Sequence, residues 1–133
     1  MPLRHLVPVA MFALAAVSAG ITAHAAPDAG RGEQLYARCA ACHALTFDRV
    51  GPRHCGLLGR RAGSVPGFDY SPAMKKSGIV WNEKTLNQFL SQPLAMVPGS
   101  SMTYAGVPEA RDRGDLIAYL KAANGGAPCG VPK

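Results

Sequence analysis

The cysteines and their neighbours are the residues of this chain whose types and spacing could do chemistry. Two of the four cysteines belong to the motif Cys39-Ala40-Ala41-Cys42-His43. This C-x-x-C-H spacing is typical of covalent c-type haem attachment. Two thiols can add to the two vinyl groups of the porphyrin, which brings the adjacent imidazole beneath the ring, within reach of the iron. The motif therefore predicts thioether bonds at Cys39 and Cys42 and an iron ligand at His43.

Three other uses of a C-x-x-C pair compete with this interpretation. A thioredoxin-like redox pair belongs on a strand-to-helix turn, and no alternating strand pattern precedes Cys39. A zinc site needs two more ligands at finger-like spacing, and beyond residue 25 the only other histidine is His54. A structural disulfide is the third alternative. We favour haem attachment because the pattern of an export signal, the haem-attachment spacing and the downstream features of the sequence agree with it.

An iron that only transfers electrons needs a second axial ligand, and a methionine is the expected one. Beyond residue 25 the methionines are Met74, Met96 and Met102. Met102 ends the turn-rich segment Pro98-Gly99-Ser100-Ser101-Met102, which could bend a thioether toward iron. Met74 falls in an expected helix, and Met96 precedes the turn. We predict Met102, with a packing role in the core as the alternative for all three side chains.

Helices at the two ends of the chain and an irregular middle are expected to position these groups. Asp28 can cap a first helix that runs through Tyr36 to the cysteine motif. Residues 43–70 are rich in glycine and proline and show little periodicity, so they are expected to form a loop wrapped around something. Three more helices are expected, from the Ser71 cap to Ser77, from the Asn82 cap to a stop before Pro93, and from Pro108 to Asn124. No strand and no internal repeat is predicted.

The length of 133 residues and mass of 13.9 kDa suit one domain after removal of an apolar leader. The run at residues 6–21 follows a basic start and leads to a small-x-small cleavage site near Ala25, which is the pattern of a secretory signal peptide. An uncut membrane anchor is the alternative, but Pro8 interrupts the run and it falls short of the roughly 20 residues that span a bilayer. We expect residues 1–25 to be the leader and residues 26–133 the functional domain.

The formal net charge of +6 falls to +5 when Arg4 leaves with the leader. An excess of basic over acidic residues is by itself compatible with binding to nucleic acid, to a membrane surface or to an acidic protein. The basic residues are scattered without a dense run, and an exported chain rarely meets nucleic acid. We therefore expect no nucleic-acid partner and no stable membrane insertion.

Seven segments, taken in order, resemble class I monohaem cytochrome c, in the bacterial branch closest to mitochondrial cytochrome c. The resemblance spans essentially the whole chain after residue 25. The segments are the C-x-x-C-H motif, Gly51-Pro52, Gly56-Leu57-Leu58-Gly59-Arg60, Pro66-Gly67-Phe68-x-Tyr70, Gly78-Ile79-Val80-Trp81, Pro98-Gly99-Ser100-Ser101-Met102 and Asp115-Leu116-Ile117-Ala118-Tyr119-Leu120. It implies an all-α fold of about five helices, with Gly/Pro-rich loops wrapped around one covalent haem.

The resemblance also implies roles for individual residues. His43 and Met102 would be the axial ligands, and the Pro52 carbonyl would accept the other ring N–H of His43. A buried haem propionate would be hydrogen-bonded by Arg60, Tyr70 and Trp81. Gly32 and Tyr36 of the first helix would pack on Leu116 and Tyr119 of the last.

Three departures from the family pattern concern tuning and docking. The loop between His43 and Pro52 is shorter than in the mitochondrial protein, and Phe89 stands where a tyrosine often donates to the methionine sulfur. The lysine ring of the family is mostly absent, although Arg38 remains. Its positions are occupied by Leu94, Ala95, Ser101, Pro108, Glu109 and Ala110.

Cys55 and Cys129 lie outside the haem motif and outside the mitochondrial pattern. In an oxidising compartment a leftover pair suggests one disulfide, which would tie the loop near the haem to the end of the chain. Two buried free thiols are the alternative.

The expected function is that of a soluble, monomeric periplasmic electron carrier rather than an enzyme. It would shuttle single electrons between respiratory or dehydrogenase proteins that dock at the exposed haem edge. One alternative is a haem subunit held permanently in a periplasmic oxidoreductase. A haem enzyme or gas sensor is the other, but His54 is the only non-ligand histidine left to act as an acid or base.

Overall fold

The computed structural model describes Met1 and residues 25–130. The predicted signal peptide therefore lies almost wholly outside the described residues. Among the residues that are described, no helix combines the length and apolar character needed to cross a membrane.

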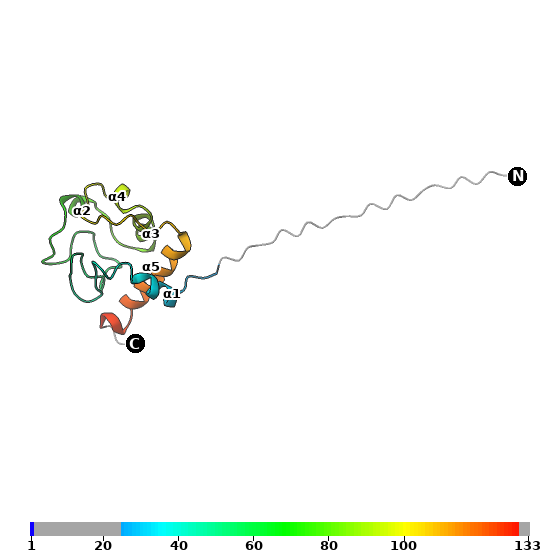
Figure 1. Cartoon of the computed structure of the whole chain (residues 1–133), viewed down its shortest axis with the longest axis horizontal. Coiled ribbons are helices and arrows are strands. Elements are labelled where there is room, and N and C mark those ends of the chain that lie inside the picture. Colours follow the sequence, from blue (N-terminus) through cyan, green and yellow to red (C-terminus); the bar gives the residue numbers. More distant parts are fainter. Residues whose placement is uncertain (2–24, 131–133) are drawn as a thin grey trace.

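Five α-helices and one 3-10 helix make up the regular structure of the described residues (Figure 1). They are α1 (Ala29–Tyr36), α2 (Pro72–Lys76), α3 (Glu83–Ser91), α4 (Pro93–Met96), α5 (Ala110–Asn124) and η1 (Ala127–Cys129). The only β-type pairing in this part of the chain is an isolated bridge between Arg61 and Val80. The all-α prediction is thus confirmed.

The first and last long helices, α1 and α5, pack directly on one another (Figure 1). Gly32 makes this possible because a Cβ there would overlap the backbone carbonyl of Asp115 and come within 2.8 Å of the Tyr119 Cβ. The Tyr36 ring lies 5.2 Å from the Tyr119 ring, and Tyr36 shares one buried cluster with Leu116. The expected packing of the two ends of the chain is therefore present.

A polar link joins the same two helices. Asp115 is 2% exposed, and its carboxylate accepts the backbone N–H of Asp28 at 2.8 Å and a bond from the Arg31 guanidinium. The backbone donor and Arg31 hold the pKa of Asp115 below its usual value. Asp28 is also the N-cap of α1, so the start of that helix is attached to α5.

Three helix boundaries differ from expectation. Helix α1 ends at Tyr36, and the chain continues to the cysteine motif as turns that begin with a 2.8 Å bond from Cys39 N to the Tyr36 carbonyl. Helix α5 begins at Ala110 rather than Pro108, because Glu109 is extended. Pro93 begins α4 instead of only ending the preceding helix, which fits a residue with no N–H and a preset φ at the first helical position.

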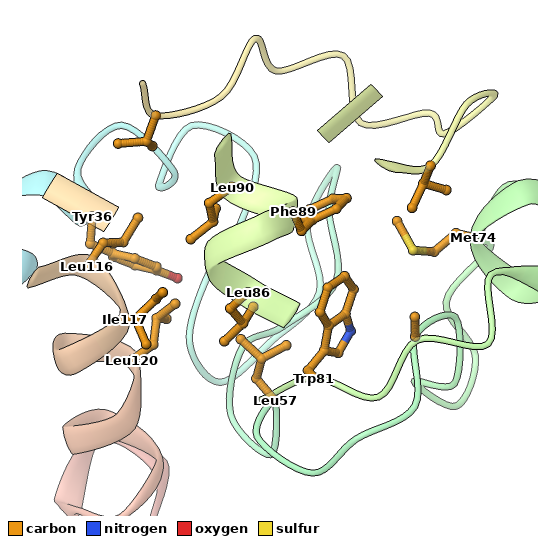
Figure 2. Close-up of a cluster of buried hydrophobic side chains, with 13 residues drawn as sticks. Tyr36, Leu57, Met74, Trp81, Leu86, Phe89, Leu90, Leu116, Ile117 and Leu120 are labelled. Atoms are coloured by element: carbon orange, nitrogen blue, oxygen red, sulfur yellow. The ribbon is translucent and has the colours of Figure 1, made fainter. Parts of the chain in front are cut away.

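Helix α3 provides the centre of the core. Asn82 caps it in a reciprocal box, in which the Asn82 side chain accepts from Thr85 N and the Thr85 hydroxyl accepts from Asn82 N, each at 2.9 Å. Figure 2 shows its apolar side chains reaching between the α5 residues and Trp81, with Phe89 pointing toward the indole. The α3 residues buried in this cluster are Leu86, Phe89 and Leu90.

The end of the chain is held against the loop that follows the cysteine motif. A disulfide joins Cys55 to Cys129, with Cα atoms 5.3 Å apart. Asn124 adds a second link, because its side chain accepts Leu57 N–H at 2.9 Å and donates to the His54 carbonyl at 3.1 Å. We refer to the Asn124 contacts and the disulfide together as the C-terminal clasp.

Candidate functional site

A cavity of about 490 Å³ lies between the core and the loops. Every residue that the sequence assigned to cofactor binding lines it, namely Cys39, Cys42, His43, Pro52, Arg60, Tyr70, Trp81 and Met102. Apolar side chains from α3 and α5, including Leu86 and Leu116, complete the wall. Residues far apart in sequence are thus brought together around one space.

The cysteine motif forms a single tight turn after α1. His43 N donates to the Cys39 carbonyl at 2.9 Å, and Cys42 N donates to the same carbonyl at 3.1 Å. Neither cysteine is part of a disulfide, and burial raises the pKa of the Cys39 thiol. The turn therefore presents two thiols and one imidazole to the same cavity.

The His43 ring is fixed at one nitrogen by the backbone. Its Nδ1 lies 2.7 Å from the Pro52 carbonyl oxygen, to which Nδ1–H donates, so Nε2 is the nitrogen left for a metal. Gly51 is required beside it, since a Cβ at this position would lie 2.6 Å from His43 Nδ1 and Nε2. Burial lowers the pKa of His43 and so favours the neutral ring that can bind iron.

Two of the three candidate methionines line the cavity. Met102 is presented by a turn in which Ser100 N donates to the Val97 carbonyl at 3.1 Å and Met102 N donates to Ser100 Oγ at 3.1 Å. Met74 also lines the cavity but is buried in the core at 8% exposure. Met96 does not line it. Met102 is therefore the only one of the three methionines that lines the cavity from a loop and is not buried in the core.

Three polar side chains gather on another part of the wall. The Arg60 guanidinium donates to the carbonyls of Cys55 at 3.0 Å and Arg53 at 2.8 Å, which ties it to the loop after the cysteine motif. Burial raises the pKa of Tyr70, whose hydroxyl accepts Val65 N–H at 3.4 Å. Trp81 is 7% exposed. A half-buried cation beside a hydroxyl and an indole suits an acidic substituent of a bound ligand.

His54 is a site residue to which the sequence gave no role. Its ring stacks on the His43 ring, with centroids 4.3 Å apart and planes 21° apart. Its Nδ1 is hydrogen-bonded to the Tyr36 hydroxyl at 3.0 Å. Burial, with smaller contributions from His43 and Arg60, lowers the pKa of His54 to about 3, so the ring is neutral at physiological pH. The one feature of the sequence that could have indicated a role near His43 is that His54 follows Pro52 by two residues.

These residues fit a haem. The cavity offers two thiols in the attachment spacing, a neutral imidazole with one free nitrogen and a soft thioether, within largely apolar walls. Such a set can hold a flat macrocycle covalently and fill both axial positions of a low-spin iron.

Comparisons with known proteins agree with this chemistry. No family model matches the chain. Cytochrome c2 of Blastochloris viridis is 40% identical over 117 residues, covering 86% of this chain and 92% of that protein. Cytochrome c2 of Rhodomicrobium vannielii is 43% identical over 107 residues, or 78% and 86% of the two chains. Cytochrome c of Tetrahymena pyriformis is 48% identical over 97 residues, or 71% and 88%.

A solved structure shares the fold. Cytochrome cH from Methylobacterium extorquens matches with a TM-score of 0.69 and 41% identity, covering 71% of this chain and 97% of that one. Relatives that are covered almost completely at this identity share both fold and cofactor. The chain therefore belongs to the class I cytochrome c family, an electron-transfer protein that carries one covalently bound haem c.

Proposed function

We propose that this chain is an exported periplasmic carrier of single electrons. Cys39 and Cys42 would hold its haem through thioether bonds, and His43 and Met102 would bind the iron. Residues 1–25 are the export signal, and residues 26–133 are the mature domain. The observation that carries the proposal is the tight turn that presents both thiols and His43 to the cavity that Met102 also lines.

The bound haem supplies an iron that cycles between ferric and ferrous. The residues of the chain keep the structural difference between these two oxidation states small. His43 is held by the Pro52 carbonyl, so its free nitrogen stays in place in both states. Apolar walls exclude water, and Arg60 offsets the charge of an acidic haem substituent. Because His43 and Met102 would both bind the iron, no position on it would be left for a substrate.

Partners are proposed to be redox proteins that dock where the haem edge reaches the surface. Val50 lines the cavity and is 81% exposed, and Leu94 is 44% exposed. These side chains favour short-range apolar contact over charge attraction. A permanent place in an oxidoreductase is the second candidate that such a surface favours, and size measurement in native periplasmic extract separates it from a free monomer.

Haem extraction tests the attachment. We expect acid-acetone to leave the haem on the protein, and the ferrous pyridine adduct to give a two-thioether spectrum. Replacing Cys42 with Ala should change that spectrum to the one-thioether form. Haem that is extracted from the unaltered chain contradicts the proposal.

Export has its own test. Protein recovered from the periplasm of the native cell should begin near residue 26, as N-terminal sequencing reads it. A chain that keeps residues 1–25 in the membrane fraction contradicts the leader assignment.

A further inference from the structure

The histidine that stacks on His43 has no part in the function proposed so far. The two rings overlap as a nearly parallel pair, with 4.3 Å between centroids and 21° between planes. His54 comes from the same loop as Pro52, which already holds the edge of the His43 ring through Nδ1. The His43 imidazole is thus held at its edge by a carbonyl and across one face by a second ring.

His54 is itself held from two directions. Its Nδ1 is bonded to the hydroxyl of Tyr36, which is 8% exposed at the end of α1. Its backbone carbonyl accepts from Asn124, and the next residue, Cys55, is bonded to Cys129. The ring is therefore a fixed surface, set by two helices that already pack on each other, rather than a side chain free to turn.

A single hydrogen bond at Nδ1 restrains the position of an imidazole better than the tilt and rotation of its plane. A flat neighbour in stacking contact resists exactly those motions, because turning one ring drives its atoms into the other. An aliphatic side chain in the same place would touch the ring but leave several orientations equally well packed. The anchored histidine supplies the missing restraint.

We propose that His54 is a positioning residue, which fixes the plane of the axial imidazole by stacking on His43 while Tyr36 anchors it. This inference rests on the proposed function, in which His43 binds the iron. Groups that orient a metal-bound histidine tune the metal as well as hold the ligand. His54 accordingly sets the electronic axes of the iron without touching it.

The test reads the ligand plane directly, in the ferric holoprotein. The spread and order of the four haem methyl resonances in the proton NMR spectrum, and the g-value anisotropy in EPR, follow the orientations of the two axial ligands, of which the variants below are designed to alter only the imidazole. We expect His54→Leu to change the order or compress the spread. His54→Phe keeps a flat ring and should retain the native order.

Two further variants separate anchoring from general disturbance of the loop. Tyr36→Phe removes only the hydroxyl and should move the methyl shifts in the direction of His54→Leu by less than half as much. Arg53→Gln is the matched control, since its side chain pairs with Asp48 at 2.9 Å in the same loop and does not line the cavity. This control should leave the spectrum unchanged.

Native methyl shifts in His54→Leu overturn the proposal, and so do equal changes in the Leu and Phe variants. If His54→Leu yields no holoprotein, Tyr36→Phe decides alone: a shifted pattern supports the anchor and an unshifted one overturns it. The unaltered protein reports separately on the underlying assignment. If it lacks a low-spin histidine–methionine spectrum, the proposed function has failed, whatever the variants do.

Discussion

The two nitrogens of His43 have different partners, and that difference makes the ring a ligand. Nδ1 donates to the Pro52 carbonyl at 2.7 Å, which fixes the tautomer and leaves the lone pair on Nε2. Burial lowers the pKa of the ring, so protons compete weakly for that lone pair near neutral pH. The protein alone therefore holds this ring in the tautomer and the neutral state that can bind iron.

Met102 is the residue on which the potential should depend most. A thioether is soft and favours ferrous iron, so Met102→Ala should lower the midpoint potential by roughly 0.2 V within the ~0.8 V range that axial ligands span. The weak sulfur-to-iron band in the near infrared of the ferric protein should disappear. Potentiometry and absorption spectroscopy measure both effects.

Met96→Ala is the control for that substitution, because Met96 packs against the core but does not line the cavity. The near-infrared band should remain in the ferric Met96→Ala protein. If Met96→Ala loses the band and Met102→Ala keeps it, the sixth ligand has been assigned to the wrong methionine.

Attachment chemistry made three of the cavity residues predictable. Thioether formation demands two thiols and an imidazole at fixed spacing, so local sequence is enough for Cys39, Cys42 and His43. The assignments of Arg60 and Trp81 needed the family resemblance, and their roles toward a propionate stay predictions. The stack of His54 on His43 was not predicted, because contact between two side chains depends on the path of a loop, which periodicity does not encode.

At the scale of elements, the contact between α1 and α5 depends on a missing side chain. A Cβ at Gly32 would overlap the Asp115 carbonyl, and neither backbone can move away without disturbing the buried Asp115 network. The close approach of these two helices brings both ends of the chain to one wall of the cavity.

Gly32→Ala should therefore destabilise the protein by about 2–4 kcal/mol, among the larger effects of single substitutions. Gly114→Ala is the matched control in α5, where a new Cβ would meet only Pro27 Cγ at 3.8 Å. That variant should be neutral or gain up to about 1 kcal/mol from helix propensity. Denaturant unfolding of the two holoproteins measures the difference, and equal stabilities would rule out the close-contact explanation.

Helix ends with a side-chain cap were the most predictable elements. Asn82 and Ser71 cap α3 and α2 as expected, because a cap is a local hydrogen bond between neighbours in sequence. Helix α4 was missed, since Pro93 is equally able to end one helix and begin the next. The course of residues 43–70 was predicted only as loop, because its turns are set by the cavity and by contacts with α5.

At the scale of the whole molecule, the disulfide of the C-terminal clasp closes residues 55–129 into a covalent loop. The disulfide spans 74 residues of sequence. In the chain-entropy model a loop of that size is stabilised by at most about 4 kcal/mol, and by less in practice. Replacing both Cys55 and Cys129 with Ser should lower the free energy of unfolding by about 1–4 kcal/mol and lower the thermal midpoint.

Cys129→Ser alone is the control for the clasp, because it breaks the same bond and should lose the same stability. Thiol labelling of the unfolded, unreduced holoprotein should find no free cysteine in the native chain and one in this variant. Labelling at positions 55 and 129 of the native chain would show that the bond is absent.

The lysines that the family pattern places around the docking rim are mostly absent from this chain. Arg38 is the remaining basic residue of the family's rim, and its guanidinium lies 3.8 Å from Asp112, which offsets part of its field. Strong steering falls steeply with salt over a Debye length of about 10 Å at 0.1 M. Here electron-transfer rates with the native partner should change less than about threefold between about 0.05 and 0.3 M salt.

Leu94→Lys should slow that reaction more than Lys121→Gln, because Leu94 is exposed at a position that the family resemblance assigns to the docking rim, whereas Lys121 lies in the last turn of α5 and pairs with Glu83. Stopped-flow mixing with the native partner measures both rates. A fall of about tenfold or more across the same salt range would restore charge as the main determinant of partner choice.

The clasp also bears on biogenesis. All three complete pairings of four cysteines consume Cys39 and Cys42, whereas the single bond between Cys55 and Cys129 leaves both motif thiols out of any disulfide. Any pairing that consumes a motif thiol removes a nucleophile that the proposed haem attachment needs. By holding the loop at Cys55 against the end of α5, the Asn124 contacts raise the local concentration of the correct partner thiol. The C-terminal clasp thus favours the one disulfide that leaves Cys39 and Cys42 available for haem attachment.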